Sequence, residues 1–170
     1  MTLDQLWAGW RMVYVSSAGS EPAAGALAGS ECVFCSIFEA SLDDAARMVV
    51  WRGERVLAML NAFPYASGHL MVMPVRHVRE LEELEGDEAA ELWEGVRRAV
   101  GALKRAYRPD GCNLGVNLGR AAGAGIPDHL HVHVVPRWVG DTNFMTATAS
   151  VRVLPEALPD SYARLSRAWQ

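Results

Sequence analysis

Three of the five histidines in this 170-residue chain occupy alternate positions, in the run His129-Leu130-His131-Val132-His133. Side chains alternate between the two faces of a β-strand, so the imidazoles share one face and the apolar residues share the other. The apolar face can pack on a core, whereas the imidazole face must meet a ligand, a metal or water. The alternation predicts a strand over residues 130–135, which Pro136 is expected to end.

Two chemical interpretations of the imidazole face are equally good at this point. Alternating histidines on a sheet can chelate a catalytic zinc ion. A neutral imidazole is also a competent nucleophile at phosphorus near pH 7. The third interpretation is a half-exposed strand that is rich in histidine by accident, and the strict alternation argues against it.

A loop of small residues lies directly before the histidines, from Gly119 to Gly125. Glycine and alanine allow backbone N–H groups to approach an anion closely, as in a phosphate-binding concavity. No Gly-Lys-Ser or Gly-Lys-Thr follows, so the loop is not a P-loop. Such a loop alone is more often a plain turn, but beside the histidine strand it favours phosphate chemistry.

The other periodicities predict an α+β fold with a mainly antiparallel sheet, one long helix and a C-terminal helix. The long helix is expected from Asp87 to about Tyr107, because apolar residues recur there at three- and four-residue steps. The remaining elements are strands over residues 55–60, 70–73 and 112–118, a loop over 61–68 and a helix over 159–170.

The chain is expected to divide near residue 30. Residues 1–30 combine a helical stripe with a flexible linker of Ser, Gly and Ala, and residues 31–170 form the compact domain. The net charge of −4 argues against a nucleic-acid partner but not against a small polyphosphate. No apolar run is long enough to span a membrane, and the N-terminus lacks a secretory signal, so we expect a cytoplasmic protein.

The run from His129 to Val135 resembles the signature of the histidine-triad (HIT) family, in which histidines alternate with apolar residues. The resemblance covers most of the chain, from residue 6 to residue 144. Residues 136–145 are similar to the diadenosine-tetraphosphate phosphorylase branch. The resemblance implies a dimeric HIT-like fold.

The resemblance also implies roles for single residues. His131 matches the family nucleophile, which forms a covalent nucleotidyl-histidine, and His133 matches the histidine that assists at the phosphate. Nucleotide or phosphate binding is implied for Asn61, His69, Asn117, Gly123, Ala124 and Gly125. For His69, a hydrogen-bonding role at the end of its loop is the preferred interpretation. The loop departs from the family pattern because it has no Ser and is one residue longer, so backbone N–H groups must replace the hydroxyl.

Two of the three cysteines, Cys32 and Cys35, have the spacing of a zinc knuckle. A redox pair and two plain core cysteines are the alternatives. In zinc-containing HIT proteins, two such cysteines join a histidine like His77 and the first triad histidine, here His129. The resemblance therefore implies a structural zinc site at these four residues, with no open position for a catalytic water. No organic cofactor is expected.

The function implied is phosphorolysis of diadenosine tetraphosphate by a homodimer that acts on small nucleotides. Hydrolysis of dinucleoside polyphosphates or of nucleoside phosphoramidates is the alternative within the family. From other classes, a zinc-dependent hydrolase that uses all three triad histidines and a non-catalytic nucleotide-binding module also remain.

Overall fold

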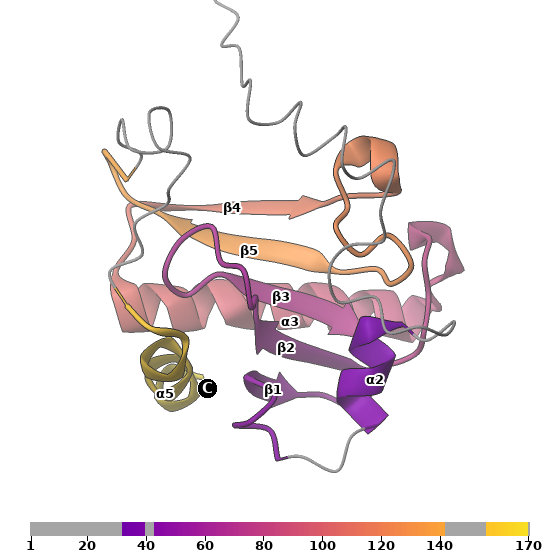
Figure 1. Cartoon of the computed structure of the whole chain (residues 1–170), viewed down its shortest axis with the longest axis horizontal. Coiled ribbons are helices and arrows are strands. Elements are labelled where there is room, and N and C mark those ends of the chain that lie inside the picture. The colour runs from indigo at the N-terminus through magenta and orange to yellow at the C-terminus, as the bar shows by residue number, and fades with distance from the viewer. Residues whose placement is uncertain (1–31, 40–42, 142–155, 170) are drawn as a thin grey trace, which may run out of the picture. The chain divides into compact units, whose positions relative to one another are not determined.

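The computed structural model describes residues 32–39, 43–141 and 156–169. It contains a five-stranded sheet in the order β1-β2-β3-β5-β4, in which every neighbouring pair is antiparallel (Figure 1). The strands are β1 (Val49–Arg52), β2 (Val56–Leu60), β3 (Leu70–Pro74), β4 (Gly111–Val116) and β5 (Val132–Arg137). The predicted α+β class is confirmed. The helix and linker predicted within residues 1–30 lie outside the described residues.

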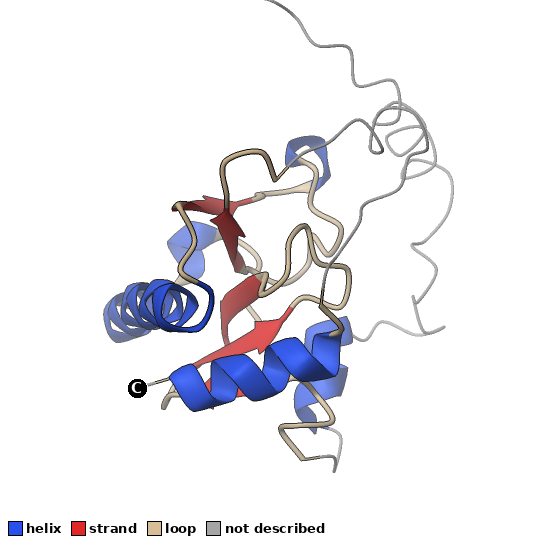
Figure 2. Ribbon diagram, turned by 90° about the vertical axis from the view of Figure 1, so that its left-hand side faces the viewer, coloured by secondary structure: helices blue, strands red, loops and turns tan. Residues whose placement is uncertain are grey.

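Helices cover both faces of the sheet. The long helix α3 (Gly86–Tyr107) and the C-terminal helix α5 (Leu158–Ala168) pack on one face, and the short helix α2 (Val33–Glu39) lies on the other (Figure 2). Two short 3₁₀ turns, η1 (Leu81–Glu83) and η2 (Arg120–Ala122), lie in connections. Among the described residues, no helix has the length and hydropathy needed to cross a membrane.

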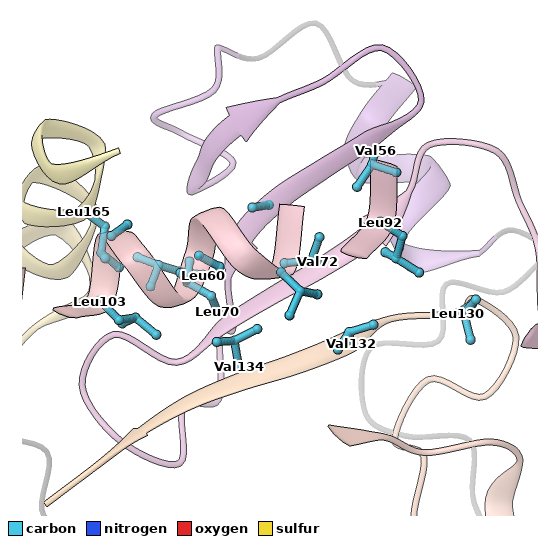
Figure 3. Close-up of a cluster of buried hydrophobic side chains, with 14 of the residues drawn as sticks. Val56, Leu60, Leu70, Val72, Leu92, Leu103, Leu130, Val132, Val134 and Leu165 are labelled. Carbon is cyan, nitrogen blue, oxygen red and sulfur yellow. The ribbon is translucent and has the colours of Figure 1, made fainter. Parts of the chain in front are cut away.

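The apolar alternation of the histidine segment is used as the sequence predicts. Leu130, Val132 and Val134 are at most 3% exposed and belong to the core between the sheet and α3 (Figure 3). The same core receives Leu103 from α3 and Leu165 from α5. Burial of this face fixes the direction of the opposite face, because a shift by one residue would bury the histidines there and expose the aliphatic residues.

Both predicted ends of the histidine strand are wrong, because β5 begins at Val132 instead of residue 130 and continues beyond residue 135. Pro136 does not end β5, which continues to Arg137 and pairs Pro136 with Cys112 of β4. The last pair between β5 and β3 is Val134 with Leu70, so Pro136 lies beyond the β3 ladder. A residue without an N–H group is tolerated where a strand has a partner on one side only. Strand β1 and helix α2 were not predicted.

Removal of the Leu103 side chain tests the core that holds the histidine strand. Leu103 is 0% exposed, and we expect Leu103→Ala to lower the free energy of unfolding by about 2–5 kcal/mol. The control is Trp93→Ala on the same helix, where the side chain is 58% exposed and the expected loss is below about 1 kcal/mol. Urea denaturation followed by circular dichroism measures both. Equal losses would contradict this description of the core.

Candidate functional site

The imidazole face of the histidine segment lies on the side of the sheet that α2 covers. The register of β5 sets His133 opposite Met71 of β3 and opposite Gly115 of β4. A second apolar cluster on this face consists of Phe34, Val49, Leu57, Met59, Met71 and Met73. His129 and His131 are buried, and His133 is half-buried. The three histidines thus line a largely dry surface.

The backbone fixes the proton of His131. Its Nδ1 lies 2.8 Å from the carbonyl oxygen of His129, and a carbonyl only accepts, so Nδ1 carries the hydrogen. The neutral ring then has its lone pair on Nε2. Burial lowers the pKa of His131, so the ring is neutral near pH 7. The Phe34 ring packs edge-to-face with it, with 5.4 Å between the ring centres. His131 therefore has the form required of a nucleophile.

A chain of hydrogen bonds fixes the opposite proton position on His133. The backbone N–H of Tyr65 donates to Nδ1 of His69 at 3.1 Å, so the hydrogen of neutral His69 is on Nε2. This Nε2 lies 3.0 Å from Nδ1 of His133 and donates to it. The hydrogen of His133 is then on Nε2, where it can be donated to a ligand. Burial, followed by the neighbouring His131, lowers the pKa of His133 to about 4.

Asn61 and His69 lie together at the ends of the loop between β2 and β3. The Asn61 amide nitrogen is 3.4 Å from Nδ1 of His69, and its side-chain oxygen accepts the N–H of Phe63 at 2.9 Å. His69 is 0% exposed, and its ring nitrogens face protein groups. This matches the preferred hydrogen-bonding role of His69. Nucleoside contact by either residue stays a prediction.

The glycine-rich loop leaves and re-enters the sheet beside the histidines. The last pair of β4 and β5 is Val116 with Val132, and the loop belongs to the connection between these two residues. Half-buried Asn117 comes directly after Val116. Gly119 and Gly123 bracket η2 with φ values of 75° and 90°, which favour glycine.

The N–H groups of this loop are partly used inside it. Gly123 donates to the Arg120 carbonyl at 2.9 Å, and Ala124 donates to the Gly119 carbonyl at 3.4 Å. Binding of a phosphate through Gly123 or Ala124 therefore requires these bonds to be exchanged. The N–H of Gly125 has no backbone partner within the described residues. The phosphate role of these residues stays a prediction.

Cys32, Cys35, His77 and His129 form a cluster whose ligand atoms all lie within 4.8 Å of one another. The Sγ to Nδ1 distances are 3.3 Å for Cys32–His129, 3.3 Å for Cys35–His77 and 3.7 Å for Cys35–His129. A tetrahedron with ordinary zinc–sulfur and zinc–nitrogen bonds has sulfur–nitrogen edges of about 3.6 Å. These four residues could hold a metal ion, and two thiolates with two imidazoles suit zinc.

A hydrogen bond at Nε2 of His129 turns the other ring nitrogen, Nδ1, toward this cluster. This Nε2 lies 2.9 Å from the carbonyl oxygen of Pro74 and must donate to it, so the lone pair is on Nδ1, beside the cysteines. His129 thus faces away from the chemistry proposed for His131. The structure brings the four residues predicted as metal ligands together, and it places His131 and His133 beside each other with ring centres 4.8 Å apart.

Residues 44–139 of the chain match the HIT domain family. The chain belongs to the histidine-triad (HIT) family. This HIT protein is 42% identical over 167 residues to the AP-4-A phosphorylase of Mycobacterium tuberculosis, which covers 98% of the chain and 85% of that protein. It is 32% identical over 93 residues to a bis(5′-nucleosyl)-tetraphosphatase [asymmetrical] of Schizosaccharomyces pombe, covering 55% of the chain and 50% of that protein.

A solved HIT structure agrees with the fold. The zinc-bound histidine triad family protein from Mycobacterium smegmatis superposes with a TM-score of 0.65 at 29% identity, over 81% of this chain and 92% of that one.

Several groups that shape the site of this HIT protein were not found from the sequence. Phe34 contacts His129 and His131 at 5.5 and 5.4 Å between ring centres. Its place between the two cysteines was the available signal. The Tyr65 amide that orients His69 is a backbone group, so no residue type marks it. Arg76, next to His77, pairs at 2.6 Å with buried Glu88 of α3, which lies 12 positions away in the sequence.

Zinc analysis of two cysteine variants tests the metal cluster. We expect about one zinc per chain in the purified protein, and its loss in Cys32→Ser, because an alcohol is a far weaker zinc ligand than a thiolate. Cys112→Ser is the matched control, since Cys112 lies on β4 outside the cluster and should leave the zinc in place. Metal content by mass spectrometry decides the outcome. A metal-free, fully folded wild-type protein would exclude the zinc site.

Proposed function

We propose that this HIT protein cleaves dinucleoside polyphosphates, with diadenosine tetraphosphate as substrate, by phosphorolysis through a covalent nucleotidyl-His131. The observation that carries the proposal is the 42% identity with AP-4-A phosphorylase along 98% of the chain. The proton positions of the two histidines support it independently. His131 offers a lone pair and His133 offers a donor, which is the division of labour that nucleotidyl transfer needs.

In the first half-reaction, Nε2 of His131 attacks the α-phosphorus of the bound tetraphosphate. A nitrogen–phosphorus bond forms, the bond from the α-phosphorus to the bridging oxygen breaks, and ATP leaves with the electron pair. The Nε2–H of His133 donates to the phosphate and offsets the charge that develops there. Because both rings are neutral near pH 7, neither needs to lose a proton before it acts.

In the second half-reaction, an oxygen of inorganic phosphate attacks the nucleotidyl phosphorus and the bond to His131 breaks. The products are then ADP and ATP, and His131 is regenerated. Attack by water instead would give AMP and ATP. The similarity to the Schizosaccharomyces tetraphosphatase favours this hydrolysis as the second candidate, although it covers only about half of the chain.

We also propose a structural zinc ion at Cys32, Cys35, His77 and His129. When bound, it would crosslink α2 to β5 and to the segment after β3, and four protein ligands would leave no position for water. The geometry speaks against a catalytic zinc on all three triad histidines. The lone pair of His129 is on the side of the cysteines, and Nδ1 of His133 is bonded to His69. The zinc-bound mycobacterial neighbour supports the presence of a zinc ion in this fold.

Dimerisation and a cytoplasmic location remain predictions. Strand β4 is the last strand of the described sheet on its side, with Leu114 49% exposed. An edge strand of this kind is where a partner strand would extend a sheet, which agrees with a homodimer.

Product analysis with diadenosine tetraphosphate tests the proposed reaction. With inorganic phosphate present we expect ADP and ATP in equal amounts, and without phosphate a much slower release of AMP and ATP. Chromatographic separation of the nucleotides distinguishes the cases. AMP at the same rate in both conditions would make the protein a hydrolase, and tight binding without products would make it a binding module.

Substitution of His131 tests the nucleophile. We expect His131→Ala to lower turnover at least about 1,000-fold, because the variant lacks the Nε2 lone pair that forms the covalent nucleotidyl-enzyme. The variant should keep the circular dichroism spectrum and the metal content of the wild type. Acid-labile, base-stable labelling of the wild type by radioactive substrate, absent in His131→Ala, identifies the intermediate. A near-normal rate in the variant would rule out this role of His131.

A further inference from the structure

The histidines of the site offer a phosphate one lone pair, from His131, and one N–H donor, from His133. Their other ring nitrogens are bonded to protein groups, Nδ1 of His131 to the His129 carbonyl and Nδ1 of His133 to His69. A zinc ion with two thiolates and two neutral imidazoles would have no net charge. The leaving group of the proposed reaction, a triphosphate, carries several negative charges. A cationic side chain from elsewhere in the chain would stabilise its outer phosphates.

Three backbone N–H groups of the glycine-rich loop are used inside the loop. Ala122 and Ala124 both donate to the Gly119 carbonyl, at 3.2 and 3.4 Å, and Gly123 donates to the Arg120 carbonyl at 2.9 Å. These bonds hold the loop around η2 and occupy N–H groups that would otherwise face an anion. A charged side chain of the loop can supplement the N–H groups that remain, such as that of Gly125.

Arg120 is the positively charged residue of this loop. Residues 117–130 contain two fully charged side chains, Arg120 and Asp128, and the Asp128 carboxylate lies 4.0 Å from Arg79 instead. Arg120 is exposed, and within the described part of the chain it has no acidic partner. By contrast, Arg137 at the far end of β5 is bonded to Asp141. Arg120 is therefore available to a ligand.

The chain places Arg120 in the connection between β4 and β5, the strand that carries His133. Asn117 directly follows the Val116–Val132 pair, and Arg120 is three residues further on. Three residues span at most about 11 Å, which the long arginine side chain can bridge in part. Figure 1 shows η2 at the end of the sheet where β4 ends and β5 begins. Arg120 is therefore assigned to phosphates beyond the one that His131 attacks.

We propose that Arg120 binds the outer phosphates of the substrate and makes the enzyme selective for long polyphosphate chains. The proposal rests on the proposed function, because it assigns His131 to the α-phosphate. A guanidinium can bond two phosphate oxygens at once and stays charged at every relevant pH, so it suits a flexible chain of phosphates. Substrates with one phosphate do not extend to Arg120 and gain nothing from it.

The experiment compares two substrates that share the attack by His131. Diadenosine tetraphosphate has a long phosphate chain, and adenosine 5′-phosphorimidazolide has one phosphate and an uncharged leaving group. We expect Arg120→Ala to lower kcat/KM for the tetraphosphate roughly 10- to 100-fold. The kcat/KM for the phosphorimidazolide should stay within about twofold of the wild-type value. Arg120→Lys should restore part of the loss, and added salt should reduce the difference between wild type and variant.

Arg167→Ala is the matched control, because it removes one exposed positive charge from α5, which packs on the other face of the sheet. This variant should have the wild-type kcat/KM for both substrates. An equal loss on both substrates in Arg120→Ala, or no loss on the tetraphosphate, would overturn the proposal.

The affinities for ATP and AMP, measured by calorimetry, give a second test that does not depend on turnover. Arg120→Ala should weaken the binding of ATP roughly 10-fold or more and leave the affinity for AMP unchanged. Equal ATP affinities in variant and wild type would refute the role of Arg120. If the wild type fails to cleave diadenosine tetraphosphate, the proposed function is wrong, and this binding comparison still decides the role of Arg120.

Discussion

His129 makes three contacts in different directions, and the rest of the site depends on them. Its Nε2 donates to the Pro74 carbonyl at the end of β3, which turns Nδ1 toward Cys32 and Cys35. Its backbone carbonyl accepts the Nδ1–H of His131 and so leaves the lone pair on the opposite nitrogen. One residue thus links the metal cluster to the proposed nucleophile.

Burial has opposite consequences for the two halves of the proposed chemistry. It keeps His131 and His133 neutral, so that a lone pair and a donor are ready near pH 7. The same burial removes positive charge from the place where a polyphosphate must bind. An exposed arginine in the neighbouring loop resolves this conflict, since it stays in water until the substrate arrives and pays little desolvation before then.

Much of the fold could be predicted from local sequence patterns. The helical period of α3 and the alternation of β5 are repeated signals, and each follows from burial of one face. Strand β1 and helix α2 were missed because each is short, with four and seven residues, and takes its stability from contacts with distant segments. The strand end at Pro136 was misplaced because the sequence does not show which neighbours a strand has at each position.

For the site, the sequence by itself determined that three histidines share one face and that two cysteines are near each other, because both follow from spacing along one segment. Only the tertiary structure decided which ring nitrogen of each histidine carries the hydrogen. The tautomers depend on the carbonyls of Pro74 and His129 and on the amide of Tyr65. Backbone groups are the same at every residue, so their part in the site is set by how the strands and loops pack and leaves no mark in the sequence.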